Sequence, residues 1–182
     1  MAVPFDPQPV LRGELLELRP LRPDDFDALY AVASDPRIWE QHPEPTRWQE
    51  PVFRAFFRGA LDSGGALVAL DRQTGRVIGT SRFTAYDAGR RVLEIGWTFL
   101  GRRYWGGRYN GEMKRLMLEH AFRWVDRVEF VIGPDNVRSR RAVEKLGGVF
   151  ARARLDPQGR ERVVYELTRE RYAPMREGSR TA

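Results

Sequence analysis

The segment 93–121 most constrains the fold, because its hydrophobic period changes in the middle. Residues 93–100 (LEIGWTFL) are apolar, aromatic and β-branched, which is typical of a strand buried on both faces. Residues 104–108 (YWGGR) then indicate a tight turn, and from Tyr109 the apolar residues recur at helical spacing. Glu112 belongs to the polar stripe on the opposite face of that helix. The segment therefore predicts a strand, a glycine turn and a helix in succession.

A glycine turn between a strand and a helix favours an anion-binding site. The first amide groups of a helix have no acceptor within the helix, and the helix dipole places partial positive charge there. Glycines let the backbone approach a ligand closely, so the turn is a candidate phosphate cradle flanked by Arg102, Arg103 and Arg108. The pattern alone leaves a second interpretation open, in which Gly106 and Gly107 only reverse the chain.

Composition excludes several classes of protein. The chain has no cysteine, which rules out disulfides, a cysteine nucleophile and thiolate metal sites, and with two histidines we expect no metal site. No apolar run is long enough to span a bilayer and no signal peptide is evident, so we expect a cytoplasmic protein without membrane contact. The formal net charge of +6 favours an anionic partner, and a compositional preference for arginine is the alternative explanation.

The order of the elements predicts an α+β fold with a mixed, mostly antiparallel sheet, in a single domain spanning 1–182 with its core at about 13–169. The proline-rich N-terminal arm is expected to be extended and the tail from Pro174 frayed. The predicted strands cover 14–21, 66–70, 77–83, 93–100, 128–132, 149–154 and 162–168, and the predicted helices cover 23–33, 48–62, the segment from 109, and 137–145.

A second group of polar residues lies at the last short helix. Asn136 precedes its first residue, where asparagine is a favoured N-cap, and Arg138 and Arg141 line one side. Both this helix and the one from Tyr109 follow buried strands. If those strands are neighbours, both helix starts open on one edge of the sheet, where such sheets bind ligands. Plain capping by Asn136 and a solvated arginine face remain the alternatives.

The loop 37–46 carries aromatic and titratable residues between prolines, which suggests a wall of a substrate site. Its candidates are Trp39, Glu40 and His42, and Arg82 on a predicted strand joins them. Acidic Glu40 would suit a cationic acceptor. The alternative is that Trp39 packs under the first helix and His42 is solvated.

Three motifs give the chain a resemblance to a known family. They are EIGW at 94–97, YWGGRYNGE at 104–112 and PDNVRSRRAVEKLGG at 134–148. From about Gly13 to Arg169 the chain resembles the Gcn5-related N-acetyltransferases, especially the branch of the ribosomal-protein alanine acetyltransferases. The resemblance implies transfer of the acetyl group of acetyl-CoA to a primary amine, on a protein N-terminus or a small molecule, by direct attack in a ternary complex. Family members are often homodimers.

The resemblance also implies a binding geometry. The sheet is splayed between the fourth and fifth strands, often at a bulge for which Gly96 is well placed, and the pantetheine arm pairs with the exposed strand. The residues expected to contact acetyl-CoA are Trp97, Thr98, Phe99, Leu100, Arg103, Gly106, Gly107, Arg108, Tyr109, Asn110, Asn136, Ser139 and Arg141.

The sequence departs from the family pattern at two places. In the usual Gly-x-Gly-x-Ala turn, Arg108 stands at the second glycine and Asn110 at the alanine. Val143 occupies the position where many members carry a tyrosine that protonates the departing thiolate. The expected catalytic groups are therefore Glu94, as a base acting through water, and Ser139 or water as the proton donor.

Two other functions stay open. One is a non-catalytic basic module of the same fold that binds acyl-CoA or nucleic acid. The other is an RNA-binding domain using Arg138, Arg140, Arg141 and the hairpin 152–162. Nucleic acid is the less favoured partner, because the hairpin arginines alternate with apolar residues and no aromatic stacking platform accompanies them.

Overall fold

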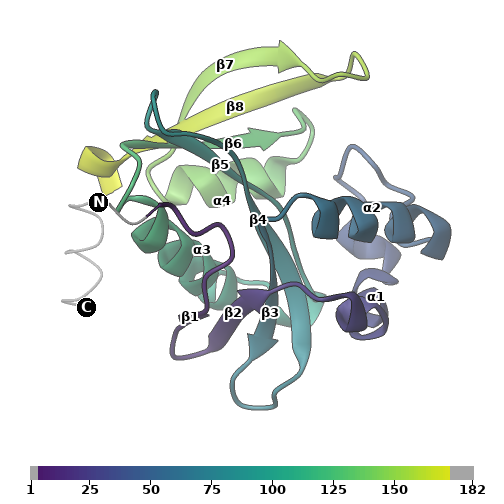
Figure 1. Cartoon of the computed structure of the whole chain (residues 1–182). Coiled ribbons are helices and arrows are strands. Elements are labelled where there is room, and N and C mark those ends of the chain that lie inside the picture. Colours follow the sequence, from purple (N-terminus) through teal and green to yellow (C-terminus); the bar gives the residue numbers. More distant parts are fainter. Residues whose placement is uncertain (1–3, 173–182) are drawn as a thin grey trace.

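The computed structural model describes residues 4–172, which form one eight-stranded sheet with helices on both faces (Figure 1). The strand order is β1-β2-β3-β4-β5-β6-β8-β7, and every neighbouring pair is antiparallel except β5 and β6. The strands are β1 (Leu11–Arg12), β2 (Leu16–Pro20), β3 (Ala66–Asp71), β4 (Val77–Asp87), β5 (Val92–Leu100), β6 (Arg127–Ile132), β7 (Val149–Leu155) and β8 (Glu161–Thr168). The α-helices are α1 (Phe26–Ala33), α2 (Glu50–Asp62), α3 (Arg108–Ala121) and α4 (Val137–Lys145). The predicted α+β class is confirmed.

The helices divide into two pairs that cover opposite faces of the sheet (Figure 1). The apolar stripe of α3 packs into the larger core cluster through Met113 and Met117, and α4 adds Val143. On the other face α1 and α2 form a second cluster rich in phenylalanine, which reaches Phe99 of β5. Because β5 is buried by both clusters, its sequence is apolar almost throughout, as predicted.

The sheet is splayed between β5 and β6. Their parallel pairing is limited to Val92–Arg127, Leu93–Val128 and Glu94–Glu129. Beyond Glu94 the two strands diverge, and β5 continues to Leu100 paired with β4 alone. The expected gap between the fourth and fifth predicted strands is therefore confirmed.

A β-bulge lies where the two strands separate. In the pairing of β4 with β5, Arg82 is opposite Gly96 and Thr80 is opposite Phe99, so β5 has one residue more than β4 in this interval. The bulge was expected at Gly96, but the unusual conformation belongs to the next residue: Trp97 has a φ of 57°. A bulky residue in the left-handed region is strained, and such strain concentrates at functional sites.

The structure corrects several predicted boundaries. The N-terminal arm contains the short strand β1, and the Phe5 ring packs against Phe83 and His120. The first helical stretch starts as a 3-10 turn before α1, and α2 begins at Glu50 rather than at 48. Strand β4 runs past 83 to Asp87. The tail from Pro174 lies outside the described residues.

Glu112, on the polar stripe of α3, is turned toward the sheet rather than toward solvent. Its carboxylate accepts hydrogen bonds from the backbone N–H groups of Glu14, Leu15 and Leu16 at 2.7, 2.8 and 2.9 Å. These amides lie between β1 and β2 or begin β2, so Glu112 holds the connection between these two strands to α3. Gly13 is required beside it, because a Cβ there would lie 2.3 Å from the Glu112 carboxyl carbon.

We expect Glu112→Ala to destabilise the protein by about 2 kcal/mol, because three backbone donors lose a charged acceptor and water replaces it only in part. Glu112→Gln keeps one carbonyl oxygen and should lose less. Denaturant unfolding of both variants measures the difference. Equal stability of Glu112→Ala and the unaltered protein would contradict this role.

Candidate active site

The start of α3 is open to a ligand. Gly106 and Gly107 have φ values of 103° and 111°, which only glycine adopts easily. The first hydrogen bond within the helix runs from Gly111 N to Gly107 O, and no side chain caps the helix start. The amides of the first three helical residues, 108–110, are therefore available as donors. Arg108 lies in the helix with an ordinary φ, so the loss of the family's second glycine does not distort the turn.

The start of α4 is arranged differently. Asn136 Oδ1 accepts a hydrogen bond from Ser139 N at 3.2 Å, so this helix is capped by its own side chain. The capping interpretation of Asn136 is thus confirmed, and contact with a cofactor stays a prediction for Asn136 and Ser139. Val143, one turn further on, is buried, and Arg141 is exposed.

The two helix starts meet at one edge of the sheet, as predicted from their positions after β5 and β6. The Arg138 guanidinium of α4 lies 3.8 Å from the centre of the Trp105 ring in the glycine turn. The backbone N–H of Arg138 donates to Gln41 Oε1 at 3.1 Å, which brings the loop 39–49 to the same edge. Trp105 Nε1 in turn donates to Leu100 O at 2.9 Å, at the end of β5.

The other predicted cofactor residues divide into three groups. The backbone of residues 97–100 lines the side of β5 that faces the gap, where it is free of β6. Arg108 and Arg103 are exposed around the turn, and Arg103 lies over the Tyr104 ring. The Tyr109 side chain points away from the turn, because its hydroxyl donates to Asp71 Oδ1 at 3.3 Å, so only its backbone amide is available at the turn.

Glu94 lies at the last pair of β5 with β6 and is not a solvated edge residue. Its side chain is 16% exposed, and its Oε1 is 3.1 Å from the position that a Cβ on Gly96 would take. Burial raises the pKa of Glu94, and the charge of Glu129 raises it further, while Arg154 and Arg82 lower it. The Arg154 guanidinium is 3.9 Å away, which is a loose ion pair. A buried carboxylate with a raised pKa beside a bulge is suited to accept a proton.

The structure separates the predicted substrate residues. Trp39 is 2% exposed, its Nε1 donates to Ala33 O at 2.7 Å, and its ring packs on Phe99. The alternative interpretation, in which Trp39 packs under the first helix, agrees with this burial, and a role of Trp39 at the substrate site stays a prediction. The next residue, Glu40, is exposed.

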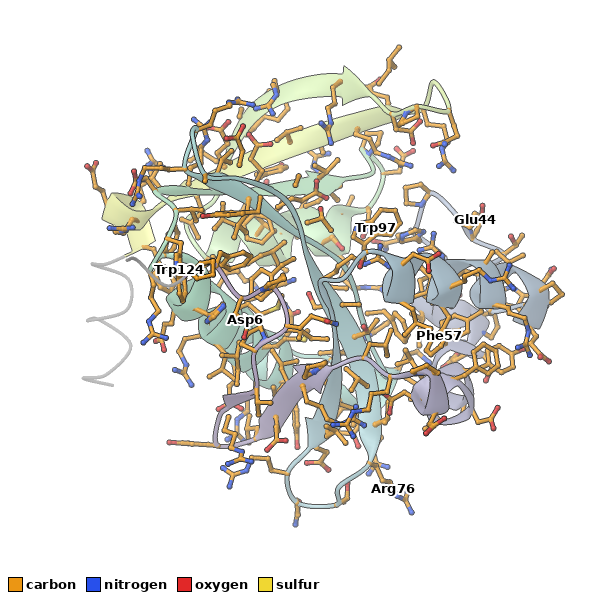
Figure 2. The ribbon with its side chains drawn as sticks, viewed as in Figure 1. Asp6, Glu44, Phe57, Arg76, Trp97 and Trp124 are labelled. Atoms are coloured by element: carbon orange, nitrogen blue, oxygen red, sulfur yellow. The ribbon has the colours of Figure 1, made fainter. Side chains whose placement is uncertain are left out.

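His42 is partly buried, and its Nδ1 accepts a hydrogen bond from Glu44 N at 2.9 Å, so it is not the fully solvated residue of the alternative interpretation. Burial, followed by the charge of Arg47, lowers its pKa to about 3, so the imidazole is neutral at physiological pH. Arg82, the fourth predicted residue, is 7% exposed and lies over the Trp97 ring. Figure 2 shows Trp97 between the sheet and α2, on the side of the loop that carries Glu44.

Sequence reasoning missed two buried cations near this site. Arg47 is 9% exposed, and its Nη1 lies 3.1 Å from His42 Nε2. Lys114 of α3 is 6% exposed, and its Nζ donates to Thr98 Oγ1 at 2.6 Å behind the bulge. Burial lowers the pKa of Lys114 to about 7. Its position between Met113 and Leu116, inside the apolar stripe, is the signal that would have identified it.

Within residues 4–172 no helix has the length and apolar character needed to cross a bilayer. The same residues bring no three histidine, cysteine or acidic side chains together in a way that would hold a metal ion.

Comparison with known proteins identifies the fold. The GCN5-related N-acetyltransferase from Brucella melitensis has a TM-score of 0.81 at 20% identity, over 96% of this chain and 85% of that chain. The GNAT-family acetyltransferase from Bacillus anthracis has a TM-score of 0.72 at 22% identity, over 88% and 99%. RimJ from Mycobacterium smegmatis, solved in complex with CoA-disulfide, has a TM-score of 0.64 at 20% identity, over 89% and 87%.

At these identities the structural likeness concerns the fold. Among curated proteins none matches the sequence. A family model described as an acetyltransferase (GNAT) domain matches residues 16–149, which include the splayed strands, the glycine turn and the whole of α4. The chain therefore belongs to the GNAT acetyltransferase family.

Proposed function

We propose that this protein transfers the acetyl group of acetyl-CoA to a primary amine by direct attack in a ternary complex. The observation that carries the proposal is the position of Glu94, a buried carboxylate at the point where β5 leaves β6. The same strand leads from Glu94 to the uncapped start of α3. The proposed proton acceptor and the proposed anion site thus lie at the two ends of the segment of β5 whose backbone edge is not paired with β6.

The residues of the gap fit acetyl-CoA, which supplies the activated acetyl group. The amides of 108–110 have no acceptor in the helix and would hold the pyrophosphate. The free backbone groups of 97–100 would pair with the pantetheine amides as an added strand would. The indole of Trp105 bonds to Leu100 O and must give up that acceptor for full pairing.

The reaction needs one proton removed and one supplied. Neutralising an amine of pKa near 10.4 at pH 7 costs roughly 4–5 kcal/mol. Glu94 accepts that proton through water, the amine nitrogen bonds to the thioester carbon, and the carbon–sulfur bond breaks. A backbone N–H near Thr98 donates to the carbonyl oxygen as it becomes negative. The sulfur takes its proton from Ser139 or water, because Val143 has none to give.

Calorimetric titration with acetyl-CoA at two salt concentrations tests the proposal. We expect micromolar binding that survives moderate salt, since much of the contact is made by backbone amides and uncharged pantetheine. Absence of binding would contradict it. Binding of nucleic acid that weakens by orders of magnitude with salt would instead support a nucleic-acid module.

A non-catalytic acyl-CoA-binding module of the same fold is the second candidate, and the valine at position 143 favours it. Release of free CoA in the presence of amines separates the two, because a module that only binds leaves the thioester intact. A cytoplasmic location and a homodimer remain predictions.

A further inference from the structure

Arg82 is a buried cation at the centre of the proposed transfer site. It lies on β4 directly opposite Gly96, the residue before the bulge. Its guanidinium carbon is 4.7 Å from the centre of the Trp97 ring and 5.8 Å from that of Phe56. The residue is 7% exposed, and its Nε is buried with no hydrogen-bond partner among residues 4–172.

A guanidinium in this position is costly without an anion. It carries five donors, and buried charges in proteins are normally paired and hydrogen-bonded. Burial lowers the pKa of Arg82 to about 10, so the group stays charged at neutral pH, and Glu94 supplies its attractive charge. Contacts with two aromatic faces recover part of the lost hydration.

Arg47 adds a second positive charge beside the first. Its guanidinium lies 4.7 Å from the centre of the same Phe56 ring, and its Nε is also buried without a partner in the described part of the chain. Burial lowers its pKa to about 10; the charge of Glu44 opposes this shift, and the charge of Arg82 adds to it. Two cations on one aromatic ring make this side of the site electropositive and suit it to a negatively charged group.

We propose that the acceptor is an amine with a carboxylate on the same or a neighbouring carbon, as in a free α-amino acid, and that Arg82 binds this carboxylate. This inference rests on the proposed transferase function. Glu94 and Arg82 both lie against Gly96, so the amine and the carboxylate of one small acceptor reach the base and the guanidinium together. The planar fork of arginine matches a carboxylate with two parallel hydrogen bonds.

Steady-state turnover with matched acceptors tests the inference. A panel of L-amino acids is compared with the corresponding L-amino acid amides, which keep the amine and lose the charge. We expect the acids to have a kcat/KM about tenfold to a hundredfold above the amides, the factor that a charged hydrogen bond contributes. The neighbouring carboxylate raises the pKa of the amine, so at neutral pH less of an amino acid than of its amide is in the reactive neutral form. Without a binding site for the carboxylate, the amides should therefore react faster, and faster turnover of the acids is diagnostic of such a site.

Arg82→Met should remove the preference, and Arg82→Lys should restore part of it. Arg76→Met is the matched control: Arg76 is exposed at the tip of the hairpin before β4, far from Trp97 (Figure 2), and should keep the full preference. Thermal melting of each variant shows whether it is folded. Equal turnover of acids and amides, or a preference that survives Arg82→Met, would overturn the inference.

A binding measurement keeps the test independent of turnover. Calorimetry with N-acetyl amino acids and with their amides uses the products of the reaction and needs no catalysis. Tighter binding of the acids, lost in Arg82→Met, supports the inference. Equal binding, or no binding of either, refutes it. Titration with acetyl-CoA, run in parallel, reports on the proposed function alone, so the two failures are distinguishable.

Discussion

Replacing Glu94 by glutamine is expected to lower kcat/KM about a hundredfold, within the range that a general base contributes. The affinity for acetyl-CoA should not change, because Glu94 lies at the other end of β5 from the turn that we propose as the phosphate site. The unaltered enzyme should gain activity as pH rises through the pKa of Glu94, which burial raises. Glu94→Gln should lose that acid limb in a pH–rate profile.

The control for this prediction is Glu129→Gln. Glu129 is opposite Glu94 in the sheet and already pairs with Arg152 at 3.0 Å. Its negative charge raises the pKa of Glu94, so removing it should shift the acid limb to lower pH and leave the plateau rate almost unchanged. If Glu94→Gln kept the unaltered pH–rate profile, Glu94 would have no part in the reaction.

Lys114→Met is expected to stabilise the protein, and by an amount that depends on pH. The folded state holds the pKa of Lys114 at about 7, below its ordinary value of 10.5, because the ammonium is buried. Below pH 7 the full cost of burying the charge is present. Between pH 7 and about 10.5 the unfolded chain binds the proton more tightly than the folded one, so the stability of the unaltered protein rises with pH.

At pH 6 the variant should therefore be more stable by about 3 kcal/mol, an advantage that falls as pH approaches 10. Denaturant melts across this range measure it, with Lys145→Met, the exposed second lysine, as the control that should show no such trend. A variant that is less stable at pH 6 would contradict the account. Loss of turnover in a stabilised variant would show that the charge behind Thr98 assists the reaction.

The fold was predictable from the period of the hydrophobic residues, and the exceptions arise from contacts between segments that are separate in the sequence. The helix α4 was predicted at its observed bounds, because Asn136 marks its start and Gly147 its end. Trp97 was predicted as an ordinary strand residue, since no propensity assigns a tryptophan to the left-handed region. That conformation is imposed by the pairing of β4 with β5, a contact between segments that local sequence does not encode.

The features of the site that depend on backbone conformation were predictable, and those that depend on the burial of side chains were less so. The glycine turn and the meeting of the two helix starts follow from strand–helix order, and both are present. The burial of Trp39 was only one of two open interpretations, and the buried contacts of Glu112 and Lys114 were missed, because residue type predicts exposure only on average. Each of these side chains contacts a partner that is distant in the sequence. The Trp39 ring packs on Phe99, the Glu112 carboxylate accepts from Leu16 N, and Lys114 Nζ donates to Thr98 Oγ1.

The early end of the pairing between β5 and β6 has a consequence for the behaviour of the protein in solution. Besides its two outer edges, the sheet has an internal edge along the second half of β5, where the backbone groups do not pair with β6. Unpaired edges are where β-proteins recruit foreign strands and begin to aggregate. Bound acetyl-CoA that pairs with this edge would cover it. At low acetyl-CoA concentration the protein would therefore be more prone to self-association.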